Sequence, residues 1–386
     1  MAVSKLHIAT NYTANNKVKL IYSGKMYFDL LLQLINSAKK NICLQFYIFL
    51  EDETGIEVMN ALKAASQRGI AVFLHLDAYA SKELPKRCIA DMRESGVNVK
   101  RFEPLLRSKH FYFGRRLHHK VVVADGIYSL VGGINVCNRY NDMPGEPAWL
   151  DMALYCQGEA SLVVENICRQ MWSTKNPLPA IQSKPIKQFE EQTPVRVRRN
   201  DWVKRKSEIW KSYLDMFSNA EKSITIMCSY FLPGRLFRIK LSQAVKRGVK
   251  VKVILAGTSD VMMAKHAERY LYDWLLKKNI EIYEYQETVL HAKVAVCDSN
   301  WATVGSYNVN NISAYASLEL NMEIKDKPFA LLLENELDNI ISLHCKQITK
   351  ENYASSTHFF RRLWQRFCYN FINNVLNLIT FYFRQE

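Results

Sequence analysis

The chain repeats one order of secondary-structure signals twice, and this repeat restricts its possible folds more than any other feature. Residues 28–76 contain an amphipathic helix, an apolar strand, a helix ending in Arg-Gly and a second strand. Residues 208–255 show the same order, again with a helix that ends in Arg-Gly. A basic last turn followed by Gly is typical of a helix C-terminus. Strands that alternate with helices predict an α/β fold with mixed, mainly parallel sheets and helices on both faces.

The repeats are separated by a segment that differs from both in composition. Residues 174–200 carry four prolines and little apolar periodicity, which predicts a linker. We therefore expect an N-terminal lobe over residues 1–173, a C-terminal lobe over residues 201–348 and a tail over residues 349–386. Two such lobes would face each other across a pseudo-twofold interface. One chain then supplies both halves of a shared site, so a monomer suffices to complete it.

A short polar motif also occurs twice, with the same gaps between its residues. The first copy is His118-x-Lys120, Asp125 and Gly132-Gly133-x-Asn135, and the second copy, 173 positions later, is His291-x-Lys293, Asp298 and Gly305-Ser306-x-Asn308. A single His-x-Lys means little, because the two residues often share an ordinary strand. Two copies in the same register, each within an apolar stretch, predict one active site built from two halves.

The residue types of the motif suit substitution at a phosphodiester. Residues i and i+2 of a strand share a face, so each motif histidine and lysine should point the same way. His119 should point to the opposite face, where we expect a structural role. One imidazole can attack phosphorus and form a phosphohistidine, while the other protonates the leaving alkoxide and later deprotonates the acceptor.

The remaining motif residues fit the binding of a phosphate group. Ammonium and amide groups can hold the non-bridging oxygens where negative charge develops. Glycines allow close approach of the backbone, and a serine adds a hydroxyl. The residues expected in these roles are Lys120, Lys293, Asn135, Asn308, Gly132, Gly133, Gly305 and Ser306. Because the lysines provide the positive charge, we expect neither a metal ion nor a cofactor.

Each imidazole also needs a carboxylate to fix its tautomer and support its cation. Asp125 and Asp298 are candidates by their spacing within the motif. Asp151 and Glu319 are candidates too, because they follow the two motifs at similar distances on short apolar strands. The spacing leaves both pairs open.

The overall composition indicates the class of partner. Lys and Arg total 52 against 37 Asp and Glu, a net charge of +15 that favours a polyanion, either nucleic acid or an anionic membrane. The nine cysteines are scattered without a Cys-x-x-Cys pair, which predicts buried reduced thiols. The first twenty residues lack an apolar core, so they predict neither a signal peptide nor a spanning helix.

Two segments mix basic and aromatic residues in the way expected at a lipid interface. Residues 104–117, just before the first motif, interleave four basic residues with three aromatic ones. Residues 357–384 lack Pro and Gly and are rich in aromatics, with three arginines before a more apolar run. An interfacial amphipathic helix fits this tail better than a spanning helix. A helix packed on the protein's own core is the alternative.

The doubled motif resembles the signature of the phospholipase D superfamily, and the resemblance extends from about residue 17 to residue 345. Within that superfamily the chain is similar to bacterial cardiolipin synthases of the shorter type, which lack N-terminal membrane spans. The stretches YIFLEDETG at 47–55 and SYFLPG at 229–234 carry this similarity, together with the sequence around each motif. The resemblance implies two phospholipase D-like lobes with the active site at their interface.

The resemblance also assigns roles that the residues alone leave open. It implies that His118 is the nucleophile and that His291 is the general acid and then the general base. The supporting carboxylates would cross between the lobes, so that Glu319 orients His118 and Asp151 orients His291. Asp125 and Asp298, although part of the catalytic motif, would then be scaffold residues that form salt bridges away from phosphorus.

The implied reaction transfers a phosphatidyl group from one phosphatidylglycerol to a second, giving cardiolipin, or to a related lipid alcohol, and it releases glycerol. The implied partners are anionic phospholipid and a membrane surface, with no nucleic acid, at the cytoplasmic side of a bacterial inner membrane. A phospholipase D that passes the same intermediate to water is an alternative, as is a nuclease of the superfamily. An inactive lipid-binding module is disfavoured, because all four motif His and Lys residues are intact.

Overall fold

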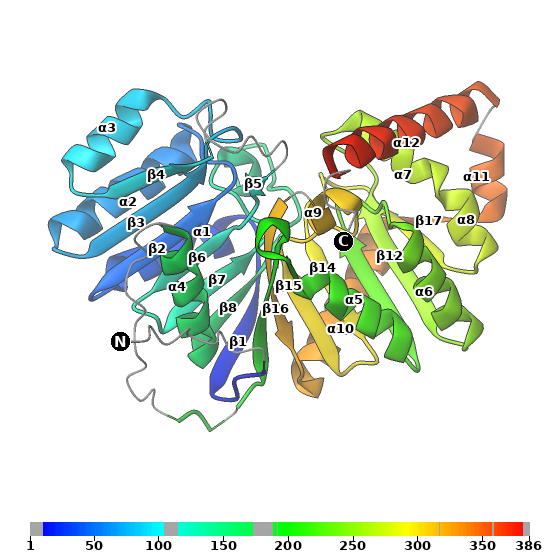
Figure 1. Cartoon of the computed structure of the whole chain (residues 1–386), viewed down its shortest axis with the longest axis horizontal. Helices are drawn as coiled ribbons and strands as arrows, with labels where there is room; N and C mark the ends of the chain where they lie inside the picture. Colours follow the sequence, from blue (N-terminus) through cyan, green and yellow to red (C-terminus); the bar gives the residue numbers. More distant parts are fainter. Residues whose placement is uncertain are drawn as a thin grey trace.

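The protein folds into two α/β lobes that lie side by side (Figure 1). The computed structural model describes residues 11–103, 115–172, 188–190, 192–315, 317–356 and 359–380. The prediction of two lobes of similar design is confirmed.

The N-terminal lobe is built on a sheet with the strand order β1-β8-β7-β6-β2-β3-β4. Its strands are β1 (Asn16–Tyr22), β2 (Asn41–Phe46), β3 (Ala71–Asp77), β4 (Asn98–Phe102), β6 (Val121–Ala124), β7 (Tyr128–Gly132) and β8 (Met152–Gly158). Its helices are α1 (Lys25–Ser37), α2 (Glu53–Gln67), α3 (Lys86–Glu94) and α4 (Glu159–Trp172), with a 3₁₀ turn at Asn138–Tyr140. Apolar residues of α1 and α2 pack on one face of this sheet, and those of α4 pack on the other.

The C-terminal lobe has the strand order β10-β9-β16-β15-β14-β11-β12-β13-β17. Its strands are β9 (Val195–Asp201), β10 (Lys206–Ser207), β11 (Ser223–Cys228), β12 (Lys250–Ala256), β13 (Glu281–Tyr285), β14 (Lys293–Cys297), β15 (Trp301–Gly305), β16 (Ser317–Ile324) and β17 (Cys345–Ile348). Its helices are α5 (Glu208–Asn219), α6 (Arg235–Lys246), α7 (Met262–Tyr270), α8 (Tyr272–Lys277), α9 (Asn311–Tyr315), α10 (Lys327–His344), α11 (Lys350–Ser356) and α12 (Phe359–Thr380), with a 3₁₀ turn at Trp202–Lys204.

The sheets are mixed, but the prediction that they are mainly parallel is wrong. Within each sheet only β2-β3-β4 and β11-β12-β13 run parallel, and the other neighbouring strands pair antiparallel. The helix-and-strand repeat that the sequence reveals builds just these parallel parts. Each motif lies in the antiparallel part, where three-residue turns join β6 to β7 and β14 to β15. Such short turns permit only antiparallel pairing.

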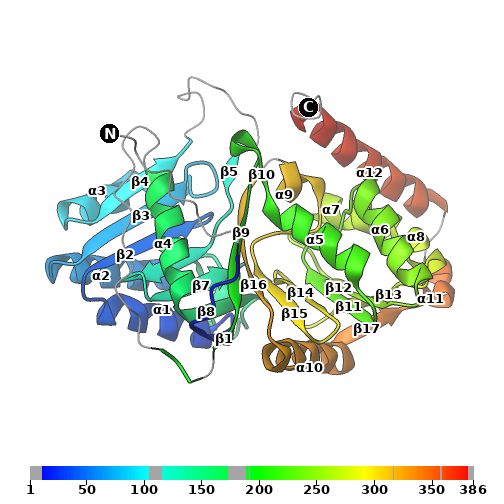
Figure 2. The same cartoon turned by 60° about the horizontal axis from the view of Figure 1, so that its bottom comes forward.

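One buried apolar cluster joins the two lobes. It contains Val131 and Leu154 from the first sheet and Val304 and Leu320 from the second. In Figure 2, β7 and β8 lie next to β15 and β16 at the centre of the molecule. The short strand β5 (Arg116–Leu117) of the N-terminal lobe pairs in parallel with β16 of the other lobe. The lobes therefore form one continuous structure at the level of the two motifs.

The predicted linker is longer than the structure allows. Residues 195–200 belong to β9, which pairs antiparallel with β16 in the second sheet. The alternation of Val and Arg over residues 195–198 is typical of a strand with one buried face, and it is the signal that indicates this element. Residues 173–187 and residue 191 of the linker region lie outside the described residues.

The tail forms helix α12, which packs against α7. Cys368 and Gln365 of α12 are buried, and the hydroxyl of Tyr353 in α11 donates to Gln365 Oε1 over 3.2 Å. In the part of the chain that the structure describes, no helix is long and apolar enough to cross a membrane. Of the basic-aromatic segment 104–117, residues 104–114 lie outside the described residues, as do residues 357, 358 and 381–384 of the tail.

The carboxylates of the two motif aspartates bind backbone N–H groups of equivalent loops. The carboxylate of Asp125 accepts from the backbone N–H groups of Lys39, Lys40 and Asn41, at 2.7 to 3.0 Å. Asp298 accepts in the same way from residues 221 to 223. These contacts are with backbone N–H groups, where the resemblance implied salt bridges away from phosphorus. They fit the scaffold role that the resemblance implied for both aspartates.

Both aspartates also have left-handed backbone conformations, with φ of 56° at Asp125 and 51° at Asp298. Partial burial opposes ionisation of Asp298, but its three backbone N–H donors prevail and lower the pKa of the carboxyl. The charged form thus caps the start of β11, as Asp125 caps the start of β2.

We expect Asp298→Gly to destabilise the fold by about 2 kcal/mol, because three N–H groups lose a charged acceptor. Glycine tolerates the positive φ, so this variant removes the carboxylate without adding backbone strain. Urea unfolding measures the change, and Asp125→Gly serves as the matched variant in the other lobe. A change below about 0.5 kcal/mol in both variants would contradict the capping role.

Candidate active site

The two motifs meet at the lobe interface, each just ahead of a strand. His118 follows β5 and Lys120 precedes β6, while His291 comes two residues before Lys293, the first residue of β14. The predicted strands therefore begin after the histidines. His119 is buried, and its Nδ1 lies 2.7 Å from Oε1 of Gln45, as expected for a structural side chain.

Each motif histidine contacts a carboxylate from the opposite lobe. His118 Nδ1 lies 2.8 Å from Glu319 Oε2 on β16. His291 Nδ1 lies 2.6 Å from Oδ2 of Asp151, the residue before β8. When Nδ1 donates to a carboxylate, Nε2 of the same ring can accept a proton or attack an electrophile. The structure therefore contains the crossed pairing that the resemblance implied, and neither lobe alone orients its own histidine.

The two carboxylates are held differently, because the motif copies differ at one position. Ser306 Oγ donates to Glu319 Oε2 over 2.5 Å, the same oxygen that faces His118. At the equivalent place in the first copy, a Cβ on Gly133 would lie 2.3 Å from Asp151 Oδ1. The serine was expected to bind phosphate, but its hydroxyl supports Glu319. The glycine leaves room for the carboxylate of Asp151.

The other predicted phosphate ligands lie in the walls of the site. A Cβ on Gly132 would meet the carbonyl oxygen of residue 152 at 2.4 Å, and one on Gly305 would meet Asn321 Oδ1 at 2.2 Å. These glycines allow close strand packing in place of the expected close approach to phosphate. Asn135 donates to the hydroxyl of Tyr140 and accepts from a backbone N–H. Among the described residues, Oδ1 of Asn308 is buried without a partner.

Both motif lysines are buried beside the histidines. Lys120 Nζ donates to the carbonyl oxygen of His118 over 2.9 Å and lies 5.0 Å from the centre of the Tyr47 ring. Lys293 Nζ lies 2.9 Å from Nδ1 of His291 and donates to the hydroxyl of Ser229 over 3.1 Å. Two cations are thus placed within reach of any anion that contacts the imidazoles.

Burial largely sets the protonation of these groups. It lowers the pKa of both histidines and both lysines, and for His118 the charge of Glu319 opposes the shift. Burial raises the pKa of Asp151 to about 7, although nearby lysine charge opposes this. The Asp151–His291 pair is therefore held as a neutral imidazole next to a readily protonated carboxyl. An anionic ligand would favour protonation of the site.

A cavity of about 550 Å³ opens onto both histidines. Its polar lining residues include Asn135, Arg116 and Arg139. Most of the other lining residues carry no motif signal in the sequence. Tyr47 lines the cavity and contacts Lys120, and Ser229 contacts Lys293. The two residues are equivalent in the repeat, because each lies six positions after the last residue bound by a motif aspartate. Arg139 and Tyr140 follow the first motif in a loop without any periodic signal.

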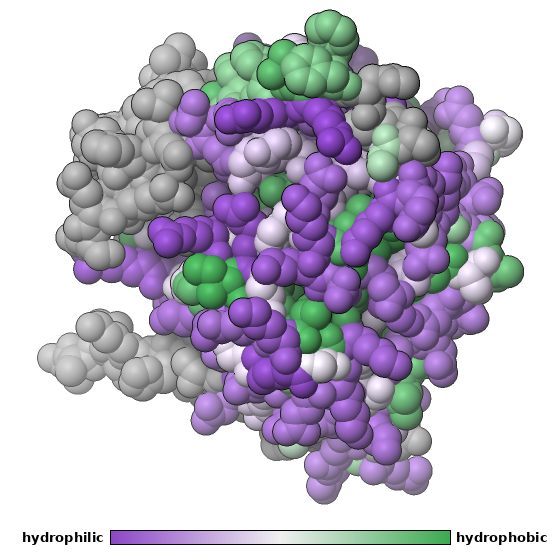
Figure 3. Space-filling model, turned by 90° about the vertical axis from the view of Figure 1, so that its right-hand side faces the viewer, coloured by the Kyte–Doolittle hydropathy of each residue, from purple (hydrophilic) through white to green (hydrophobic). Residues whose placement is uncertain are grey.

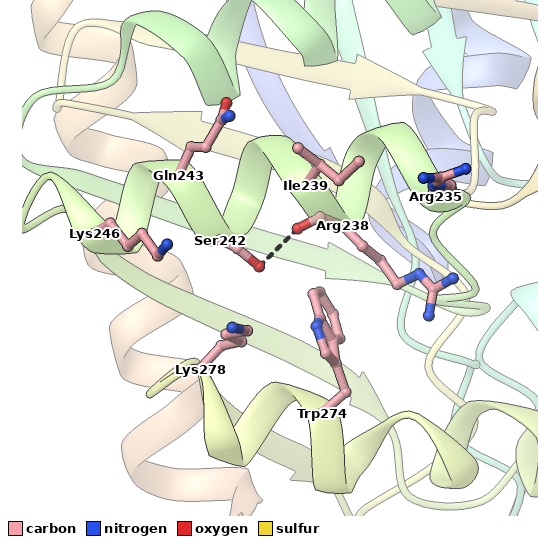
Figure 4. Close-up of a pocket in the computed structure, with 8 residues that line it drawn as sticks. All are labelled: Arg235, Arg238, Ile239, Ser242, Gln243, Lys246, Trp274 and Lys278. Carbon is pink, nitrogen blue, oxygen red and sulfur yellow. Dashed lines mark hydrogen bonds between the residues drawn. The ribbon is translucent and has the colours of Figure 1, made fainter.

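A second hollow, of about 350 Å³, lies between α6 and α8 and contains none of the motif residues. Figure 4 shows lining side chains along α6, with Trp274 on α8 and Lys278 just after it. They are Arg235, Arg238, Ile239, Ser242, Gln243, Lys246, Trp274 and Lys278. We call this surface the basic hollow. No carboxylate lines it, so it adds local positive charge outside the catalytic cavity.

Comparisons with known proteins agree with this architecture. The family described as "Cardiolipin synthase, PLD-like domain" matches residues 31–172 and 213–341. Cardiolipin synthase B of Escherichia coli K12 is 30% identical over 353 residues, covering 88% of this chain and 83% of that protein. Cardiolipin synthase B of Salmonella typhimurium LT2 is 32% identical over 357 residues, covering 89% and 84%. Phosphatidylserine synthase of Haemophilus influenzae has the same fold, with a TM-score of 0.74 at 16% identity over 96% of this chain and 97% of that one.

The fold and the doubled site define a phospholipase D-like enzyme. More narrowly, the chain belongs to the cardiolipin synthase family, a group of phospholipid phosphatidyltransferases.

We expect Asp151→Asn to reduce activity but to make the fold more stable at alkaline pH. In the folded protein the pKa of the Asp151 carboxyl is about 7, above its ordinary value of 3.8. As the pH rises, the unfolded chain therefore loses this proton before the folded protein does. The free energy of unfolding therefore falls as the pH rises from about 4 to about 7. Above that range the folded protein carries the full cost of a buried, ionised carboxylate. Asparagine fits the same space and removes this cost.

Thermal melting of the variant and the parent at pH 5 and pH 8 tests this expectation. The melting temperature of Asp151→Asn relative to the parent should be several degrees higher at pH 8 than at pH 5. Glu319→Gln is the matched variant for the other pair. An equal difference at both pH values would show that Asp151 is ionised across this range.

Proposed function

We propose that the protein transfers a phosphatidyl group from one phosphatidylglycerol to the terminal hydroxyl of a second, giving cardiolipin and glycerol. The observation that carries this proposal is the pair of histidine–carboxylate contacts across the lobe interface, next to two buried lysines. Membership of the cardiolipin synthase family supports the lipid substrate.

In the first step, Nε2 of His118 attacks phosphorus and forms a P–N bond. The bond from phosphorus to the glycerol oxygen breaks, and that oxygen takes from His291 the proton that the Asp151–His291 pair gains when the anionic substrate binds. Lys120, Lys293 and the Asn308 amide neutralise the non-bridging oxygens as their charge increases. The products of this step are free glycerol and a phosphatidyl group on His118.

In the second step, the terminal hydroxyl of another phosphatidylglycerol gives its proton to His291 and attacks phosphorus. The P–N bond breaks, and cardiolipin leaves with both histidines restored to their starting state. This scheme needs one histidine that is a good nucleophile and another that readily exchanges a proton.

The unequal carboxylates support the assignment of these two roles. Glu319 accepts hydrogen bonds from Ser306 and from His118 on the same oxygen, so its carboxyl group is fixed against the imidazole. A carboxylate fixed at this place would offset the positive charge that develops on a phosphohistidine. Asp151 has a pKa of about 7, so its pair with His291 can gain or lose a proton near neutral pH. We therefore assign the nucleophile to His118 and the acid–base role to His291.

Transfer to a lipid instead of hydrolysis requires that water be kept from the intermediate. Much of the cavity wall beyond the histidines is apolar, with Leu232, Val261 and Ala264 among its lining residues. This lining favours a lipid acceptor over water.

Radiolabelled phosphatidylglycerol tests the nucleophile directly. We expect His118→Ala to form no labelled enzyme after quenching in detergent at alkaline pH, where the acid-labile P–N bond survives. In His291→Ala the label should remain on the protein, while cardiolipin formation falls by about 10²–10⁴-fold because the acid–base group is missing. Labelled His118→Ala together with unlabelled His291→Ala would reverse the assignment. Mass spectrometry of the lipid products distinguishes cardiolipin from phosphatidic acid.

We also propose that the enzyme works as a peripheral protein at the cytoplasmic face of a bacterial inner membrane, and that α12 contacts the lipid. Figure 3 shows hydrophobic side chains at the top of this face of the molecule, where α12 lies. Phe360, Trp364, Phe367 and Phe371 recur every three or four residues and are 46 to 80% exposed. We call this row the aromatic stripe. Such a stripe with arginines nearby is typical of an interfacial helix.

We expect Trp364→Glu/Phe367→Glu to weaken binding to vesicles of phosphatidylglycerol and phosphatidylcholine at least tenfold, at both low and high salt. The loss persists in salt because apolar insertion is not screened. Lys246→Gln/Lys278→Gln in the basic hollow is the matched control, since it lowers the net charge by the same two units. The control should weaken binding at low salt only. Equal salt dependence of the two variants in a vesicle sedimentation assay would rule out insertion of the stripe.

A further inference from the structure

The cavity at the catalytic histidines has a lining of two chemical kinds. Its polar part includes the imidazoles, Arg116, Arg139 and Asp260, whose carboxylate accepts from the hydroxyl of Tyr230. An apolar wall comes from two helices far from the first motif in the sequence. The residue before α7 and α7 itself contribute Val261, Met263 and Ala264, and α12 contributes Phe371, Ile372 and Val375. These six side chains offer a phosphate group no hydrogen bond.

The apolar wall continues onto the outer surface of the protein. Phe371 is 46% exposed and belongs both to the cavity lining and to the aromatic stripe. Its ring stacks against Phe367, which stacks in turn against Trp364. On α7, Met262 next to the lining residues is 60% exposed. Apolar side chains thus run without interruption from the stripe to the cavity.

The helices that form this wall are held firmly against each other. The Tyr270 ring of α7 lies 4.8 Å from the Tyr369 ring of α12, and His266 meets Trp364 edge-on at 6.4 Å. Cys368 is fully buried between the stripe and the α7 contact. The wall is therefore a surface that α7 and α12 build together.

We propose that this wall is an acyl-chain subsite, in which Phe371, Val375 and Met263 hold a fatty acyl chain of the lipid whose phosphate lies at the histidines. The chain would leave the bilayer along the aromatic stripe and reach the cavity without crossing water. α12 is then part of the substrate site as well as a membrane contact. This inference rests on the proposed function, because it needs a lipid phosphodiester at the catalytic centre.

The chemistry of the wall distinguishes an acyl chain from other occupants. A nucleic acid or a water-soluble diester would place sugar and charged phosphate against aliphatic side chains, which costs desolvation without new hydrogen bonds. An acyl chain gains free energy for each methylene removed from water. Recognition at this wall should therefore increase with chain length.

Short-chain phosphatidylglycerols, kept monomeric below their micelle concentration, separate this subsite from membrane binding. For the full-length enzyme, we expect kcat/KM to rise up to roughly fourfold per added methylene from butanoyl through hexanoyl to octanoyl chains. Phe371→Ser/Val375→Ser should flatten this dependence, and Met263→Ser on the α7 wall should reduce it independently.

The matched control is Phe360→Ser/Leu363→Ser, which removes similar apolar surface from α12 outside the cavity. Both side chains are more than half exposed, and neither lines the cavity. This control should weaken vesicle binding yet keep the chain-length dependence of the parent. Circular dichroism verifies that all variants are folded.

Two outcomes would overturn different parts of the argument. If the parent converts all three lipids but Phe371→Ser/Val375→Ser keeps the same chain-length dependence, the acyl-chain subsite is wrong and the proposed function stands. If the parent converts no phosphatidylglycerol of any chain length, the proposed function itself fails.

Discussion

The active site depends on two hydrogen bonds that cross the boundary between the lobes. His118 is oriented by Glu319 and His291 by Asp151, so each half of the duplication supplies the other with its carboxylate. These polar groups are buried, and such groups are tolerated only when their partners are held in place. The shared apolar cluster and the β5–β16 pairing provide that fixed geometry. Interface packing is therefore a condition for the chemistry as well as for the fold.

One difference between the motif copies makes the two histidines unequal. Ser306 gives Glu319 a second hydrogen bond, whereas Gly133 only makes space for Asp151. The same burial that raises the pKa of Asp151 also makes this carboxyl costly to ionise. Buried carboxyl groups with raised pKa values are common where a group must exchange protons near neutral pH. The two copies of the motif thus give their histidines different surroundings.

Much of this architecture could be predicted from the sequence. The repeated order of helices and strands and the equal motif gaps indicated two lobes and one site, and the resemblance supplied the crossed pairing of Glu319 and Asp151. The antiparallel strands beyond each motif were missed, because their short turns carry weaker signals than the helix-strand repeat. The role of Ser306 could not be deduced, since it depends on a contact between strands. Likewise, no local pattern indicates that Phe371 lines the cavity, because this placement depends on how α12 packs against α7.

The distance along the chain between His118 and its partner has a consequence for synthesis. Their positions differ by 201 residues, so the first histidine leaves the ribosome long before Glu319 exists. Until β16 is made, His118 of a nascent chain lacks both its supporting carboxylate and the strand that pairs with β5. Under the proposed mechanism, the emerging chain would be unable to attack the lipids around it. Reactivity would appear only after the second lobe has been made.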